Sequence, residues 1–156
     1  MIHLKKFNES NDIQEELKDF CEIHLAYLLD DGLEISISNR SNLGFYYITL
    51  EYKNKNDKYK YYFPSWDDIK DNIISFFIHL SKSNNYTLLK KGGKEVFIDY
   101  LTIDNSNLWD GIQIFNSGSN FKFSLNNIVN DETEVLKKLN GRFRILNIHL
   151  IVEIKK

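Results

Sequence analysis

The sequence predicts one α+β domain in which a largely antiparallel sheet, built from hairpins, packs against two main helices and a short third helix. Three observations support this prediction. The chain has 156 residues, 42% of them hydrophobic, which suits a single domain with one core. Apolar residues recur at helical spacing in some segments and alternate with polar residues in others. No Gly/Ser-rich linker divides the chain, so we expect a polar leader at residues 1–10 and one domain at residues 11–156.

The first helix is predicted to begin after the N-cap Asn11, with Gln14 as the capping-box partner, and to end at Gly32. Acidic residues gather near its start, where they interact favourably with the helix dipole. The apolar stripe that we expect to face the core comprises Ile13, Leu17, Phe20, Cys21, His24, Tyr27 and Leu28.

The second helix is predicted to begin at Pro64-Ser65, with Ser65 as its N-cap and Asp68 at the capping-box position. Its apolar stripe comprises Trp66, Ile69, Ile73, Phe76, Phe77 and Leu80. Residues 131–141 are predicted to form a short third helix, which is capped by an acidic pair and ends at a glycine.

Alternating apolar and polar residues predict the first strands of the sheet. A half-buried strand is expected at residues 33–38, and a first hairpin is expected to join residues 46–52 to residues 59–63. A second hairpin is expected to join residues 86–89 to residues 96–103, because Gly-Gly readily adopts the positive φ angles of a tight turn.

The remaining strands are predicted from shorter patterns. Strands at residues 112–115 and 121–123 are expected on either side of a turn at residues 116–120, after a loop at residues 104–110. The chain is expected to finish with one long strand at residues 143–154.

The sequence contains no established catalytic motif. It lacks a nucleophile elbow, a phosphate-binding Gly loop, a Rossmann fingerprint and an acid-rich metal motif. The single cysteine, Cys21, excludes a disulfide framework and a Cys-based zinc cluster. The spacing within residues 104–111 does not fit a calcium loop. We therefore expect no catalytic residue, no metal and no cofactor, while an enzyme without a recognisable motif stays open as an alternative.

The histidines allow two enzymatic interpretations. His24, close to Cys21 on the first helical stripe, would act as a metal ligand or general base, but the helix is acidic and a partly buried structural histidine is favoured. His79 and His149 would form the paired His-x-Thr/Ser motifs of two-histidine phosphoesterases, in which imidazoles act as acid and base. That match is poor, because Ile151 stands where the second motif requires a hydroxyl.

Charge is distributed unevenly along the chain. Residues 1–34 contain nine acids and three lysines, whereas both predicted hairpin tips are rich in lysine. The candidate ligand-binding residues on these tips are Lys55, Lys58, Lys60, Tyr62, Lys90, Lys91 and Lys94. In the functional interpretation, the lysines contact phosphates and the aromatic rings stack on bases. In the alternative interpretation, the lysines keep exposed sheet edges from pairing with other chains.

Three stretches of the sequence resemble segments of one group of proteins. These stretches are MIHLKKFNES at residues 1–10, LLDDGLEI at residues 28–35 and WDDI at residues 66–69. They are similar to segments of small accessory proteins encoded by large tailed phages of AT-rich hosts. The resemblance implies a setting, such as host takeover, counter-defence or a minor role in the virion, and it assigns no functional residue.

The expected location is the cytoplasm, and the host cytoplasm if the protein is viral. No apolar run reaches the roughly 18 to 20 residues that span a bilayer. The polar opening lacks the apolar segment of a signal peptide. We therefore expect no membrane partner, and the net charge of −2 does not favour nucleic acid as a general partner.

The leading functional hypothesis is a non-enzymatic accessory protein that binds a host macromolecule or a small anionic ligand. The missing catalytic motifs, the aromatic content of 14% and the uneven charge support it. The alternatives are a small phosphoesterase or nucleotide-processing enzyme that uses His79 or His149, and a minor structural protein of the virion. The sequence does not define the oligomeric state.

Overall fold

The computed structural model describes residues 2–39, 44–52, 63–109, 112–130 and 143–154, with only the backbone at residues 2–11, 101–120 and 143. Its elements, in chain order, are α1 (Ile2–His24), α2 (Ala26–Asp30), β1 (Leu33–Asn39), β2 (Phe45–Tyr52), α3 (Trp66–Ser81), β3 (Tyr86–Leu88), β4 (Val96–Trp109), β5 (Ile112–Phe123), α4 (Leu125–Asn130) and β6 (Phe143–Ile154). The predicted α+β class is confirmed, because the strands form an antiparallel sheet that packs with helices.

The last strand of the chain, β6, occupies the middle of the sheet. The strand order is β1-β2-β6-β4-β5, and β3 also pairs with β6. One edge of β6 pairs with β2, from Phe45 opposite Glu153 to Glu51 opposite Asn147. The other edge pairs first with β4 and then with β3, at Leu88 opposite Val152. The last strand of the chain is therefore a direct neighbour of β2, the second strand.

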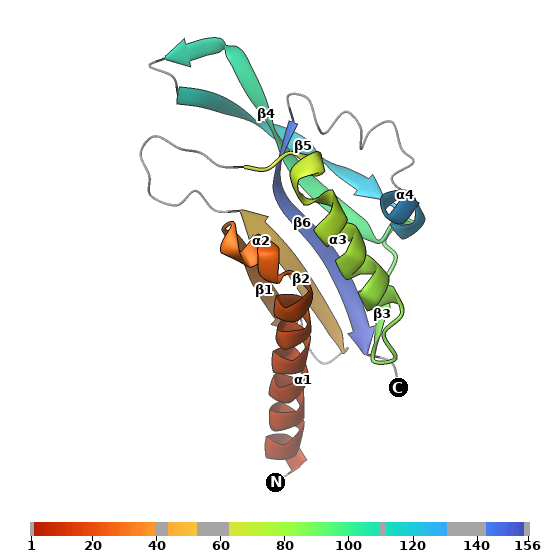
Figure 1. The fold of residues 1–156 in the computed structure, drawn as a ribbon. Coiled ribbons are helices and arrows are strands. Elements are labelled where there is room, and N and C mark those ends of the chain that lie inside the picture. The colour runs from red at the N-terminus through yellow and green to blue at the C-terminus, as the bar shows by residue number, and fades with distance from the viewer. Residues whose placement is uncertain (1, 40–43, 53–62, 110–111, 131–142, 155–156) are drawn as a thin grey trace.

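The helices cover one face of this sheet. In Figure 1, α1 and α3 lie on the same side of the strands. Residues of β2 alternate strictly between half-buried and buried, and the buried ones contact the helices as part of one core. The buried strand residues include Tyr46, Ile48, Leu50, Ile98, Ile148, Leu150 and Val152. Each such aliphatic side chain contributes roughly 1.5–3 kcal/mol when it leaves water. The alternate residues point to the opposite face, which no described helix covers.

The predicted second helix is confirmed as α3. Its predicted stripe is buried at every position, from Trp66 to Leu80. The carboxylate of Asp68 accepts a hydrogen bond of 3.0 Å from the backbone N–H of Ser65, as expected for a capping box. The backbone N–H of Ile145 donates to the carbonyl of Pro64 at 2.8 Å, so the start of α3 is attached to the central strand β6.

The first helix differs from its prediction at both ends. It begins at Ile2 and not after Asn11, because no glycine or proline interrupts residues 2–24. It ends at His24, and α2 follows Leu25 as a separate helix. The prediction that Tyr27 faces the core is wrong, because Leu25 and Leu28 are the buried residues of this segment and the side chain of Tyr27 is 78% exposed. Gly32, with φ of 104°, allows the chain to turn into β1.

The first predicted hairpin is wrong. The alternation predicts that residues 46–52 pair with residues 59–63, but both edges of β2 are already occupied. β1 pairs with one edge and β6 with the other. Residues 53–62 lie outside the described residues, as does the whole of the predicted third helix at residues 131–141.

The second predicted hairpin is also wrong in its pairing, although its turn is present. Gly92 and Gly93 have φ of 62° and 79°, and the backbone of Lys91 bonds with that of Lys94 on either side of them. β3 and β4 do not pair with each other. Both pair with the same edge of β6, so they lie end to end and the Gly-Gly turn projects between them.

The pair β4 and β5 is longer than predicted. The sequence predicts a loop at residues 104–110 and a turn at 116–120, whereas β4 runs through residue 109 and β5 through residues 112–123. Register shifts occur after Asp99 and after Asp104. Such irregularities let a ladder continue through Asn-, Ser- and Gly-rich sequence that otherwise indicates a turn. The short helix α4, which the sequence pattern does not predict, buries Ile128 and packs against α3.

Cys21 provides a direct test of how α1 packs. Its side chain is fully buried, and burial raises the pKa of the thiol to about 12, with a smaller contribution from the nearby Glu22 carboxylate. At pH 8 about one thiol in ten thousand would then be ionised. We expect the native protein to resist DTNB at pH 8 and to react fully in denaturant, as measured by absorbance. Native reaction at the rate of an unfolded peptide would contradict the packing of α1.

Candidate functional site

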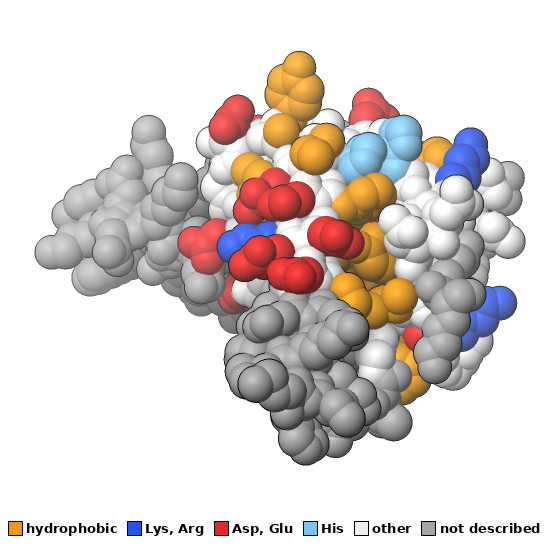
Figure 2. Space-filling view, turned by 90° about the horizontal axis from the view of Figure 1, so that it is seen from below, with side chains coloured by type: hydrophobic (Ala, Val, Ile, Leu, Met, Phe, Trp, Pro, Cys, Tyr) orange, Lys and Arg blue, Asp and Glu red, His pale blue; other side chains and the backbone are white. Residues whose placement is uncertain are grey.

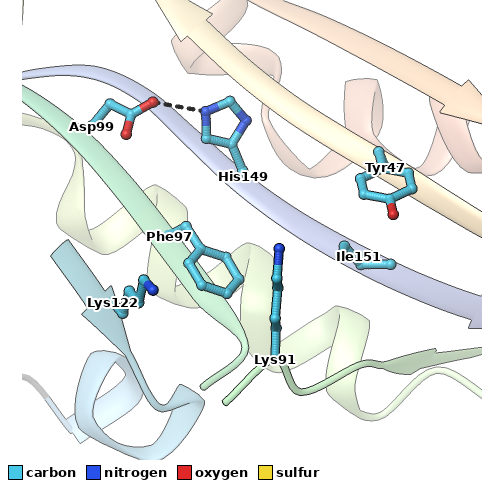
Figure 3. A pocket seen from close by; sticks show the side chains of 7 residues that line it. All are labelled: Tyr47, Lys91, Phe97, Asp99, Lys122, His149 and Ile151. Carbon is cyan, nitrogen blue, oxygen red and sulfur yellow. Dashed lines mark hydrogen bonds and ion pairs between the residues drawn. The ribbon is translucent and has the colours of Figure 1, made fainter. Parts of the chain in front are cut away.

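A pocket lies on the open face of the sheet, opposite the helices. We call it the sheet-face pocket, and its volume is about 320 Å³. Figure 3 shows its lining from close by. The lining residues are Tyr47, Lys91, Phe97, Asp99, Lys122, His149 and Ile151. Because these residues come from β2, β4, β5, β6 and the Gly-Gly turn, five segments of the chain form one site.

Strand register explains how these side chains meet. Thr49 lies opposite His149, His149 lies opposite Phe97, and Phe97 lies opposite Lys122. These four residues form a continuous row across β2, β6, β4 and β5. Tyr47 and Ile151 form the next pair along β2 and β6. Since side chains on paired strands share a face at opposed positions, the row places all of these groups on the open side.

His149 is held by a neighbour on each side. Its Nε2 lies 2.9 Å from Oδ2 of Asp99, and its Nδ1 lies 3.2 Å from Oγ1 of Thr49. A carboxylate only accepts hydrogen bonds, so the nitrogen that faces Asp99 carries the proton. In the neutral ring, Nδ1 then accepts a hydrogen bond from the Thr49 hydroxyl. Both ring nitrogens are therefore engaged within the protein, and the imidazole has no lone pair directed to a ligand.

Two ammonium groups give the pocket its positive charge. Lys91 projects from the Gly-Gly turn, and Lys122 comes from β5. Within the described part of the chain neither side chain has an ion-pair partner. The neighbouring Lys90 differs, because its ammonium group lies 3.9 Å from the nearly buried carboxylate of Glu95. Glu95 also accepts a hydrogen bond from the backbone N–H of Leu125 and so connects the turn to α4.

Asp99 contributes the acidic group of the pocket. It is 31% exposed in its side chain, and the described residues offer it no hydrogen bond besides that from His149. One carboxylate oxygen therefore remains available as an acceptor. With Lys91 and Lys122 opposed by this single carboxylate, the pocket keeps a positive balance.

The predicted ligand-binding lysines have different positions. Lys91 lines the sheet-face pocket, whereas Lys90 pairs with Glu95, and Lys94 closes the turn through its backbone. The first hairpin's candidates, which lie outside the described residues, are Lys55, Lys58, Lys60 and Tyr62. Among the described lysines, the structure therefore does not bring the three lysines of the turn together at one site.

Most of the pocket lining is not predictable from the sequence. No motif singles out Lys122, Phe97 or Asp99, and the alternation assigns Tyr47 only to the polar face of its strand. The alternation along β2 and β6 is visible, but the register between them joins segments about 100 positions apart. Proximity of this kind depends on the fold, so no local signal indicates it.

His24 and His79 lie on the helical side of the sheet. His24 stacks on His79 of α3, with ring centroids 4.4 Å apart, and also contacts Phe20. Burial lowers the pKa of His24, and the proximity of His79 lowers it further. The predicted structural role is supported over a pairing with Cys21, which is buried with a raised pKa. His79 and His149 lie on opposite faces of the sheet, so their imidazoles do not converge.

The exterior of α1 is acidic. Figure 2 shows acidic side chains gathered beside hydrophobic ones on the face seen from below. Among the described side chains of α1, the exposed acids are Asp12, Glu15, Glu16, Asp19 and Glu22. Ile23 and Tyr27, which are 72% and 78% exposed, lie near its C-terminal end. These acids of α1 thus lie on the helical side, whereas Lys91 and Lys122 line the sheet-face pocket.

Searches for a metal centre and for similar proteins gave negative results. Among the residues that the structure describes, no three His, Cys, Asp or Glu side chains are placed to share a metal ion. None of the described helices combines the length and the apolar character needed to cross a bilayer. Comparison with protein-family models, curated proteins and solved structures found no match.

The hydrogen bonds of His149 predict its tautomer. We expect the Nε2–H form to predominate in the neutral ring, because Asp99 accepts from that nitrogen. The ¹⁵N shifts of the imidazole nitrogens report the tautomer directly. In Asp99→Asn the carboxamide is able to donate or accept, so we expect a mixed population. A predominant Nδ1–H form in the unmodified protein would rule out the arrangement described.

Proposed function

We propose that this protein binds a small anionic ligand in the sheet-face pocket and does not transform it. The observation that carries the proposal is the convergence of Lys91 and Lys122, from separate elements, on one concave site without ion-pair partners among the described residues. Unpaired cations in a concave site attract anions more strongly than cations on a flat surface. Lys91 is also among the residues that the sequence pattern predicts for this role.

The magnitude of binding follows from the groups present. A hydrogen bond to a charged group contributes roughly 1.5–3 kcal/mol, so two ammonium groups supply about 3–6 kcal/mol before ordering costs. That range corresponds to dissociation constants from the millimolar range toward tens of micromolar. Tighter binding requires further contacts with the ligand beyond the two lysines.

The bonding of His149 favours binding over catalysis. A general base needs a nitrogen within hydrogen-bond reach of the ligand's proton. Nδ1 and Nε2 of His149 are engaged by Thr49 and Asp99, so the ring serves to shape the pocket. The phosphoesterase alternative also requires two imidazoles at one phosphate, and the distant position of His79 on α3 gives it no support.

A macromolecular partner is the second candidate, and the surface of α1 and α2 favours it. Exposed Ile23 and Tyr27 next to the acids of α1 would suit a basic protein surface with an apolar contact. The resemblance to phage accessory proteins supports a setting of host takeover or counter-defence for either candidate, with the host cytoplasm as the expected location.

The proposal is tested by titrating the protein with inorganic phosphate, pyrophosphate and AMP in a calorimeter at low salt. We expect at least one of these anions to bind. Lys91→Ala and Lys122→Ala should each weaken binding about tenfold, as expected from the loss of one charge-assisted contact. Binding should also weaken as salt is added.

Lys82→Ala is the matched control, because Lys82 is exposed at the end of α3 on the helical side. This variant should bind like the unmodified protein. Absence of binding by all three anions would defeat the proposal, and so would equal losses in Lys82→Ala and the two pocket variants.

A further inference from the structure

We infer that the ligand of the sheet-face pocket is a mononucleotide. Its phosphate lies at Lys91 and Lys122, and its base stacks on the aromatic wall, by which we mean Phe97 and Tyr47. This inference rests on the proposed function, since it specifies which anion the pocket takes. Three features of the pocket lead to it: an aromatic ring with no ring partner among the described residues, an available carboxylate oxygen and acidic residues at both ends of the site.

The aromatic wall favours a planar group. Phe97 is half-buried on the open face, next to Lys122 in the row, and makes no ring contact with any described residue. Tyr47 lies across β6 from Phe97 and opposite Ile151, and Figure 3 shows the Lys91 side chain between Phe97 and Ile151. A simple inorganic anion gains nothing from these surfaces. A nucleobase stacks on them, and its affinity rises with the apolar and aromatic area that it covers.

The carboxylate of Asp99 favours a ligand that carries hydrogen-bond donors. A carboxylate beside two lysines repels an anion and lowers the pocket's affinity for inorganic phosphate. One oxygen of Asp99 is engaged by His149, which leaves the other as an acceptor. A nucleotide carries donors, on its ribose and on its base, at some distance from its phosphate. The pocket therefore contains two cations, a hydrogen-bond acceptor and an aromatic surface. These complement the phosphate, the donors and the base of a nucleotide.

The volume of the pocket and the acidic residues at its ends favour a single nucleotide over a polynucleotide. A volume of about 320 Å³ lies at the lower end of ordinary ligand pockets. Along β2 the open face continues from Thr49 to Glu51, and along β6 it continues from Ile151 to Glu153. Carboxylates at both ends would repel the neighbouring phosphates of a polynucleotide. The net charge of −2 also disfavours nucleic acid.

The inference is tested by comparing AMP, ribose 5-phosphate, adenosine and a ten-residue oligoadenylate as ligands of the full chain in the same calorimetric assay. AMP should bind at least about tenfold more tightly than ribose 5-phosphate, which lacks the base, and than adenosine, which lacks the phosphate. The oligoadenylate should bind no more tightly than AMP.

A pair of variants locates the base. Phe97→Leu should weaken AMP binding about tenfold and leave ribose 5-phosphate unchanged, because only the ring surface is lost. Tyr27→Leu, which removes an exposed aromatic ring on the helical side, should change neither. If Phe97→Leu does not fold, the ligand comparison on the unmodified protein still decides the question.

The possible failures are distinguishable. If no anion binds, the proposed function itself fails. If anions bind through the lysines but AMP is no better than ribose 5-phosphate, anion binding stands and the nucleotide is wrong. If the oligoadenylate binds more tightly than AMP, the ligand is a single strand and the mononucleotide is wrong.

Discussion

The helices pack on only one face of the sheet, and successive residues of a strand point to opposite faces. The rest of this structure depends on this combination. Every second residue of β2, and of β6 from Ile148 to Val152, is buried in the core that the helices share. The same alternation presents the intervening residues on the uncovered face. Core and candidate site are therefore determined together, since a one-residue slip of β6 would bury His149 and expose Leu150.

The uncovered face becomes a site because β6, from the end of the chain, pairs between β2 and β4. This placement makes Thr49, His149, Phe97 and Lys122 neighbours in one row. The end-to-end arrangement of β3 and β4 along the same edge of β6 lets the Gly-Gly turn project between them, with Lys91 directed toward the pocket. The strand pairs that position the polar groups of the site thus also position the residues of the core. The hydrogen bonds of His149 to Thr49 and Asp99 join β6 to β2 and β4.

Sequence patterns predict the parts of the fold that depend on local periodicity. The stripe of α3, the alternation of β1 and β2 and the long final strand are all anticipated by the sequence. The pairing of the strands is predicted poorly, because strands that follow one another in the chain are expected to form hairpins. The position of β6 between β2 and β4 depends on contacts between distant parts of the chain, which leave no local signal in the sequence. For the same reason the sequence singles out Lys91 as a candidate and does not single out Lys122, although both line the pocket. The first is prominent beside two glycines, whereas the second matters only through its register with Phe97.

The central claim is that the uncovered face of the sheet, and not the helical side, is where this protein recognises its ligand. Titration of ¹⁵N-labelled protein with AMP, followed by amide chemical shifts, tests it most directly. The account predicts that the largest shifts fall on residues 47–49, 97–99 and 149–151 and on the Gly-Gly turn, with little change along α1 and α3. Shifts concentrated around Ile23 and Tyr27, with an undisturbed sheet face, would contradict it.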